Sequence, residues 1–506
     1  MGNAIHGAVV RALFVLAILA QRTAHAAPGE LADGTALPEL RLSDVITVAV
    51  RQSPDLARAR LDLDAARAQL LRAQGIEDTH LTADAQVDVT IASSNDPSGD
   101  TESESVRVGA SRALPSGGTL SVSALGARDR RAEVTLGPDG MPQASVLSRY
   151  SAGLSLGLVQ PLLRGAGSDA FRAPIHQAER QRDAAALTAE ARARDVLVSL
   201  SQSYWQAAFA WRQLEIRKAS LELAQKQLTY TESAIRAEKV PRSELLAVQQ
   251  AIATRKQDIL AGEQELYERS LTLRQVAGLE IGPDALAVRT ELLPGKIEAA
   301  DPELDAIVRD AYAHSAELAA LEASRRAAEI AAAAADNAAR SRLDLSVAAG
   351  PVGADISATD ALTAVIRHPG FQIVAGLSGD HAIEHRTERG GQAAARAALL
   401  TAKIAERDAR ARLGVRVTRA VQRARAALAS IALGDQAIDL AGQNVAAEQK
   451  RFELGKSTNF DVLRRQDELE QARLRQATAV VDYLGARAEL DGLSGAILGR
   501  YHIVMP

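Results

Sequence analysis

The stretches "TESAIRAEKVPRSELL" (231–246) and "EQKRFELGKSTNFDVL" (448–463) align without a gap at an offset of 217 residues. The same offset holds upstream, where a series of apolar positions in one half meets apolar positions in the other. In the first half these positions are Leu200, Tyr204, Ala207, Trp211, Leu214, Leu221 and Leu228, and in the second half Val417, Val421, Ala424, Leu428, Ile431, Ile438 and Val445. A register kept over this length predicts a duplicated structural unit.

Both series follow alternating steps of three and four residues, which is the heptad spacing of a coiled coil. The pattern is interrupted twice at matching positions, at Lys218 and Asp435 and at Gln225 and Gly442. In the first half, a helix-favouring sequence runs from about 174 to 237, with Pro174 expected in the first helical turn. A helix of roughly 60 residues is about 90 Å long, which no globular domain needs. A second apolar stripe (Trp205, Phe209, Ile216, Ala219, Leu223 and Tyr230) indicates neighbours on two sides. A closed ring of helices and an ordinary antiparallel coiled coil both fit this pattern.

Each half is expected to run in the order helix, strands, long helix, helix. The first repeat (27–279) has a predicted helix at 44–76, strands within 80–163, a long helix at about 174–237 and a helix at 243–279. The second repeat (303–496) has a predicted helix at 303–340, strands at 342–350 and 370–379, a long helix at about 391–454 and a helix at 459–494. A linker (280–302) joins the repeats, and a tail (497–506) follows them.

Between the helices the apolar period changes to two. In "LTADAQVDVTI" (81–91) and "SAGLSLGLVQPLL" (151–163), apolar residues alternate with polar or small ones. Alternation over about 9–11 residues suits a transmembrane β-strand, although a half-buried strand of a soluble sheet has the same pattern. Four such strands are evident, with a further hairpin (106–112 and 119–125) as an option, so that 106–148 is either strand or loop. The polar stretches 93–105 and 350–360 are expected to be loops.

Four to six strands are too few to close a barrel in a membrane, where open sheet edges are not tolerated. If these strands span a membrane, several copies of the chain must therefore share one barrel. The fold class expected is α+β, with long coiled-coil helices and a membrane sheet.

Composition and the N-terminal sequence limit the possible partners and the location of the protein. The net charge of −4 gives no basic field for nucleic acid, and the absence of cysteine excludes disulfides. Residues 1–26 have the form of a signal peptide, with the apolar run "ALFVLAILA" (12–20) before Ala24-His25-Ala26. The chain is therefore expected to be exported.

One motif suggests a different function. "HAIEH" (381–385) has the H-x-x-E-H pattern of a zinc peptidase. Such a site requires His381 and His385 on one face of a helix, whereas here the motif follows a predicted strand and precedes Gly390-Gly391. We therefore expect a connection between strand and helix, with no metal, no cofactor and no enzymatic activity.

Three stretches, taken in their order, spacing and duplication, resemble the TolC-like outer-membrane efflux family. They are "LSDVITVAVRQSPDL" (42–56), "GLVQPLLRGAG" (157–167) and "RFELGKSTNFDVL" (451–463). The resemblance covers about 40–495 and implies a homotrimer with a twelve-stranded barrel in outer-membrane lipid and a helical barrel in the periplasm. It also implies a passive exit duct for efflux or type I secretion, which works with a periplasmic membrane-fusion adaptor and an inner-membrane pump.

The resemblance further implies where the working residues lie. The adaptor-docking tips fall on Lys239, Val240, Pro241 and Arg242 and on Gly455, Lys456, Ser457 and Thr458. An acidic pore constriction just past the second tip falls on Asp461, while the second acidic position of the family is Arg464 here, which departs from the pattern. Glu244, at the repeat-equivalent position of Asp461, is a further candidate. The alternative is that both acids only stabilise the first turns of their helices.

A second function also fits long helical hairpins in an exported chain. Periplasmic adaptors and scaffolds carry them too, normally as a single hairpin flanked by soluble β-domains. The duplicated hairpin favours the duct, and an adaptor or scaffold stays as the alternative.

Overall fold

The structure is a computed structural model that describes residues 40–91, 100–136, 142–279, 289–295, 297, 303–501 and 503. The expected signal peptide (1–26) lies outside these residues, as do most of the expected linker, part of the loop expected at 93–105 and the end of the tail. The chain forms two compact units. The described residues of one unit lie within 40–62, 186–319 and 407–503, and those of the other within 63–185 and 320–406.

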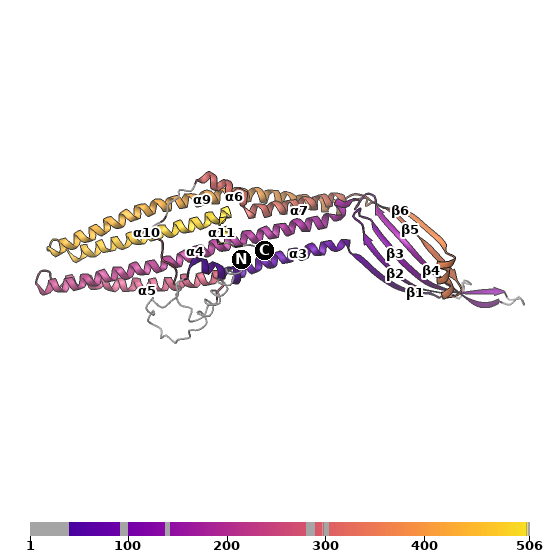
Figure 1. Cartoon of the computed structure of the whole chain (residues 1–506), viewed down its shortest axis with the longest axis horizontal. Coiled ribbons are helices and arrows are strands. Elements are labelled where there is room, and N and C mark those ends of the chain that lie inside the picture. Colours follow the sequence, from indigo (N-terminus) through magenta and orange to yellow (C-terminus); the bar gives the residue numbers. More distant parts are fainter. Residues whose placement is uncertain are drawn as a thin grey trace, which may run out of the picture. The chain divides into compact units, whose positions relative to one another are not determined.

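The first unit is helical and contains two antiparallel hairpins. One pairs α4 (Ser168–Arg236) with α5 (Glu244–Ala277), and the other pairs α9 (Arg386–Glu453) with α10 (Asn459–Ser494) (Figure 1). The helices α2 (Leu42–Gln52), α6 (Leu304–His314) and α11 (Ala496–Arg500) also belong to this unit. Among the described residues, no helix is both long enough and apolar enough to cross a membrane.

The heptad positions of the sequence form the core of this unit. Leu200, Tyr204, Ala207 and Leu214 are buried on α4. Of their repeat equivalents on α9, Val417, Val421 and Ala424 are buried and Ile431 is half-buried. Tyr204 also holds the residue that precedes α2 closely, because its hydroxyl donates to the carbonyl of Leu40 at 2.8 Å. The coiled-coil spacing therefore identified the core-facing side of both long helices.

The second unit is built on one six-stranded antiparallel sheet. Its strands are β1 (Thr79–Thr90), β2 (Thr101–Ala113), β3 (Thr119–Leu136), β4 (Pro142–Pro161), β5 (Arg342–Asp355) and β6 (Gly370–Asp380). They lie side by side in sequence order, β1-β2-β3-β4-β5-β6 (Figure 1). The optional hairpin of the sequence is therefore present as β2 and β3, and no long loop replaces it.

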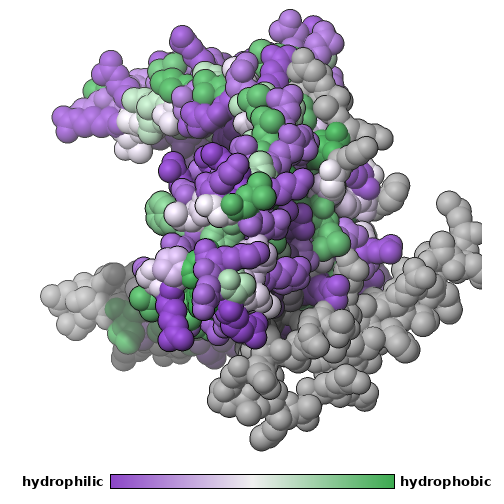
Figure 2. Space-filling view, turned by 90° about the vertical axis from the view of Figure 1, so that its left-hand side faces the viewer, coloured by the Kyte–Doolittle hydropathy of each residue, from purple (hydrophilic) through white to green (hydrophobic). Residues whose placement is uncertain are grey.

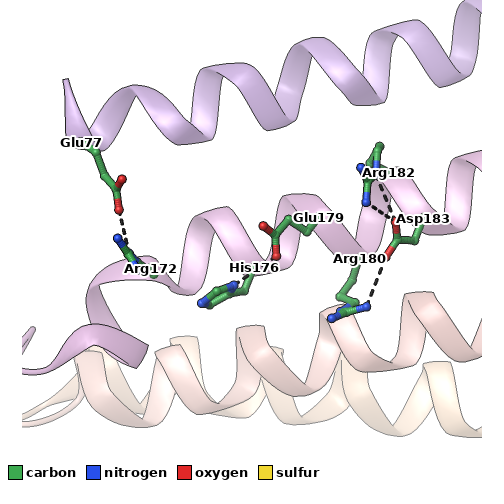
Figure 3. Close-up of polar contacts among 7 residues, drawn as sticks. All are labelled: Glu77, Arg172, His176, Glu179, Arg180, Arg182 and Asp183. Atoms are coloured by element: carbon green, nitrogen blue, oxygen red, sulfur yellow. Dashed lines mark hydrogen bonds and ion pairs between the residues drawn. The ribbon is translucent and has the colours of Figure 1, made fainter. Parts of the chain in front are cut away.

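Helices α3 (Pro54–Gln74) and α7 (Ala316–Ala338) also lie mainly in the second unit, with the short η1 helix (Gly75–Glu77) preceding β1. Figure 3 shows Glu77 of η1 reaching Arg172 of α4, with Nε and Oε1 2.7 Å apart. Farther along α4, Arg180 and Arg182 both bind the carboxylate of Asp183 (Figure 3). Such partly exposed pairs orient side chains but add little stability.

Two predicted helices are each divided into two. The helix predicted at 44–76 breaks at Ser53, because Pro54 lacks an N–H and pushes the residue before it out of the helical region, to φ −62° and ψ 123°. The helix predicted at 303–340 breaks at Ser315, where φ is −71° and ψ is 107°. The Ser315 hydroxyl accepts from the N–H of Leu318, which starts α7 as a separate helix.

Both long helices begin earlier than predicted. α4 starts at Ser168, so Pro174 lies inside the helix and not in its first turn. α9 starts at Arg386, five residues before the predicted start at about 391, and so includes Gly390. Acidic residues in the first turns, Asp169 and Glu388, favour these starts through the helix dipole.

The loop prediction at 350–360 was wrong. Strand β5 continues to Asp355, and a helix that the sequence analysis missed, α8 (Ala358–Arg367), follows it. α8 packs on β4 and β5. Gly353 permits this contact, because a Cβ there would lie 2.5 Å from the carbonyl oxygen of Ala361 and 2.8 Å from the nitrogen of Val365.

This contact gives a test of the sheet unit. Substitution Gly353→Val should displace α8 at an overpacking cost of roughly 1–3 kcal/mol and accelerate hydrogen exchange of the α8 amides. Gly126→Val on β3 is the matched control, since a Cβ there has nothing within 4 Å. Equal protection of α8 in the two variants would contradict the packing.

Candidate functional site at the helix turns

The second predicted tip is a tight turn between α9 and α10. Gly455 adopts φ 70°, a conformation that costs glycine little. The N–H of Lys456 donates to Arg451 and that of Gly455 to Phe452, at 2.8 and 2.9 Å, which closes the end of α9. The Ser457 hydroxyl binds the Glu448 carboxylate at 2.5 Å.

Asp461 stabilises the start of α10. Its carboxylate Oδ2 accepts from the hydroxyl and the N–H of Thr458 at 2.7 and 3.3 Å, while the Thr458 hydroxyl accepts from the N–H of Asp461. This is a capping box. The side-chain and backbone hydrogen bonds from Thr458 lower the pKa of Asp461 below its ordinary value of 3.8. The carboxylate therefore stays charged at more acidic pH than an ordinary aspartate.

The first predicted tip, between α4 and α5, repeats this turn with a different residue at its centre. Glu238 is the repeat equivalent of Gly455 and has φ 55°. A residue with a Cβ costs of order 1–3 kcal/mol in this conformation, so the turn is held by its surroundings. The N–H of Lys239 donates to Ala234 at 2.9 Å, as that of Lys456 does to Arg451. The alignment of Glu238 with Gly455 in the repeat is the sequence signal for this strained position.

Glu244 joins the two tips. Its Oε2 accepts from the backbone N–H of Asn459, the first residue of α10, at 3.0 Å. The Asn459 side-chain amide in turn donates to the carbonyl of Glu244 at 3.4 Å. A carboxylate at the N-terminus of a helix satisfies an unpaired N–H and interacts favourably with the helix dipole.

A cluster of buried polar side chains lies next to this hydrogen bond between the tips. The Asn459 Oδ1 accepts from Gln227 Nε2 at 2.6 Å and from Thr231 Oγ1 at 3.0 Å. Asn459 and Thr231 are fully buried, and Gln227 is nearly so. The sequence analysis did not identify these residues. The available signal was two polar residues spaced four apart on one face of a long helix.

Arg255 makes a second connection among the helices. Its guanidinium donates to the Ser220 carbonyl on α4 and to Gln466 and Asp467 on α10, at 2.9, 3.0 and 2.7 Å. The Arg255 side chain is 6% exposed, while that of Asp467 is 59% exposed. The planar, forked guanidinium can reach all three acceptors from one position on α5, which a lysine cannot do.

Arg464 lies one turn beyond Asp461 on α10. Its Nε is 3.5 Å from the Glu468 carboxylate, and its side chain is 65% exposed. The structure therefore brings Glu244 and Asp461 to the first turn of α10, while Arg464 pairs farther along the helix.

The H-x-x-E-H motif lies in the connection from β6 to α9. His381 and His385 fall outside any helix, and His385 has φ 51°. Their Nε2 atoms are 3.3 Å apart, and His381 Nδ1 is 2.8 Å from the Ser341 hydroxyl. Within the described ranges, no group of three or more His, Cys, Asp or Glu residues is placed to hold a metal ion. The helical placement that a zinc peptidase requires is not found.

Comparisons with known proteins agree with this architecture. Residues 100–279 match the family model described as outer membrane efflux protein. No curated protein sequence matches the chain.

Among solved structures, the outer membrane protein VceC of Vibrio cholerae shares the fold at 16% identity and a TM-score of 0.63, over 90% of this chain and 96% of that one. The CmeC outer membrane channel of Campylobacter jejuni shares the fold at 12% identity and a TM-score of 0.65, over 93% of this chain and 90% of that one. The MtrE outer membrane channel of Neisseria gonorrhoeae, in its open state, shares the fold at 14% identity and a TM-score of 0.62, over 90% of this chain and 89% of that one.

These findings confirm the resemblance to the TolC-like outer-membrane efflux family, which is a family of transport channels and not of enzymes. They also support a location in the outer membrane with an extension into the periplasm.

The buried link between the tips can be tested by a double-mutant cycle. Asn459→Ala removes the acceptor of the buried Gln227 amide and should cost about 1–3 kcal/mol, measured by hydrogen exchange at the first turn of α10. Gln227→Leu in the same chain removes the amide donor that Asn459→Ala leaves unpaired. The double variant should therefore lose less stability than the sum of the losses in the two single variants. Additive losses would show that Gln227 and Asn459 are not coupled.

Proposed function

We propose that the chain is the outer-membrane exit duct of an efflux or type I secretion system. Three copies would close their sheets into one barrel in the outer membrane and their helices into a tunnel in the periplasm. The observation that supports this best is the shared fold, which extends over at least nine-tenths of the chain to VceC and to the CmeC and MtrE channels. The match of residues 100–279 to the efflux family supports the same assignment. The comparisons give no support to an adaptor or scaffold.

The two turns are proposed as the docking surface for a periplasmic adaptor and, through it, an inner-membrane pump. The residues involved are Lys239, Val240, Pro241 and Arg242 on one turn and Gly455, Lys456, Ser457 and Thr458 on the other. Most of them are exposed. Figure 2, which looks onto the side of the molecule at the left of Figure 1, shows a mostly hydrophilic surface with scattered hydrophobic residues. A hydrophilic surface suits a docking site that is exposed to water before its partner binds.

The pore constriction is proposed to lie at Asp461, with Glu244 and Arg464 beside it. The lowered pKa of Asp461 supports a fixed negative charge there. The Glu244 carboxylate also has a structural role, because it accepts a hydrogen bond from the N–H of Asn459. Three copies would bring three such groups around one axis, where rings of charged side chains select ions by sign.

Deletion of the gene and fractionation of the envelope test the duct. We expect a trimer in the outer-membrane fraction, and we expect the deletion strain to become sensitive to toxic compounds or to lose export of a cargo. Complementation with the full chain should restore both. A soluble periplasmic species would favour the scaffold and contradict the duct.

Ion selectivity tests the constriction. Asp461→Asn preserves an oxygen acceptor for the capping bonds and removes the charge, so trimers in planar bilayers should lose cation preference, read from the reversal potential in a salt gradient. The unaltered channel should keep that preference as the pH falls to the ordinary aspartate value of 3.8, because the pKa of Asp461 lies lower. Asp439→Asn, at an exposed position on α9, is the control. Equal reversal potentials for both variants and the unaltered channel would place the constriction elsewhere.

A further inference from the structure

The hairpin of β2 and β3 occupies the middle of the sheet. β2 pairs with β1 along the whole of β1, from Thr79↔Arg112 to Thr90↔Thr101. β3 pairs with β2 on one side and with β4 on the other. β1 and β4 are therefore not neighbours, and the hairpin cannot leave the sheet without exposing an edge of each.

The apolar face of the sheet runs through this hairpin without interruption. One row of directly paired residues crosses all six strands and is apolar at every step: Leu81, Ala110, Val122, Leu156, Ala349 and Ile373. The large side chains of this row are uncovered in the single chain, with Leu81 82%, Val122 51% and Ile373 67% exposed. A continuous exposed apolar face of this kind marks a surface that contacts another protein or a membrane.

The next row, one residue along each strand, faces the opposite side. It consists of His80, Ser111, Ser121, Gly157, Ala348 and Val374. On β2 and β3 this side is therefore small and polar while the first is apolar. That alternation is the signature of a wall between lipid and a water-filled lumen.

Charges on the hairpin mark where the apolar face ends. Past Val106, the same side of β2 carries Glu104 and Glu102, which pair with Arg128 and Arg130 of β3 at 3.5 and 2.9 Å. Tyr150 of β4 places its ring 5.6 Å from the Arg128 guanidinium. Aromatic and charged groups at the limit of an apolar face are typical of the membrane interface. Beside them, α8 covers part of this face and exposes Leu362 and Ile366.

The two outer strands leave one edge each. In the described part of the chain, β1 pairs only with β2, and β6 only with β5. All five pairings are antiparallel, so β1 and β6 run in opposite directions. The β6 edge of one copy can therefore continue the antiparallel order against the β1 edge of the next copy.

From these observations we infer that the inserted hairpin is part of the membrane wall, so that each copy contributes six strands and a trimer closes an eighteen-stranded barrel. The inference rests on the proposed function and deepens it. Its covering partners are lipid on the apolar face and a second copy at each edge. Because barrel diameter grows roughly linearly with strand number, the outer-membrane lumen would be about half again as wide as in a twelve-stranded barrel.

Fluorescent labelling at single cysteines tests this directly, since the chain has no cysteine of its own. Full-length trimers in phosphatidylcholine vesicles would carry a thiol-reactive bimane at Val122→Cys or at Ser123→Cys on β3. Nitroxide-labelled lipid is the quencher. The pair Leu81→Cys and Thr82→Cys on β1 is the reference. We expect strong quenching at Val122 and Leu81 and weak quenching at Ser123 and Thr82.

Two results would overturn the inference in different ways. If the β1 pair alternates but both β3 positions are weakly quenched, the hairpin lies outside the wall and the proposed membrane barrel survives without it. If the β1 pair does not alternate either, the membrane barrel itself is wrong. Should Val122→Cys fail to assemble, Val106→Cys and Arg107→Cys on β2 ask the same question, with strong quenching expected only at Val106.

Discussion

The backbone groups along the outer edges of β1 and β6 are the constraint on which the rest of the protein depends. Each edge presents N–H and C=O groups that no described strand of the chain pairs. In water such an edge is an aggregation hazard, and in lipid each unpaired group costs several kcal/mol. A sheet with an apolar face and two open edges therefore calls for further copies of itself.

The helical unit has a different constraint, because its two hairpins must pack in a defined register. Leu200, Tyr204 and Ala207 supply the apolar contact, which does not by itself fix which turn lies beside which. The bonds from Asn459 to Gln227, Thr231 and Glu244 do so, since they are satisfied only when the tips of the two hairpins are level. A single buried polar residue fixes the register of some coiled coils in the same way.

Much of this architecture could be predicted from the sequence, and the failures have physical causes. The repeat and the heptad spacing identified the helical cores and both turns, because core positions recur with a fixed period. The breaks at Ser53 and Ser315 were missed because one residue suffices to end a helix, and β2 and β3 remained optional because glycine, serine and arginine weaken their alternation. At the site, Asp461 was proposed from the family resemblance and Glu244 from its repeat equivalence with Asp461. Asn459, Gln227 and Arg255 were not, since their partners lie more than 200 residues away in the chain.

The most direct measurement is an electron cryomicroscopy reconstruction of the complex extracted from native outer membranes into lipid nanodiscs. This account expects three copies, with β6 of each paired to β1 of the next, and eighteen strands in one closed wall. A monomer with both edges open would contradict it. So would a twelve-stranded wall from which β2 and β3 are excluded.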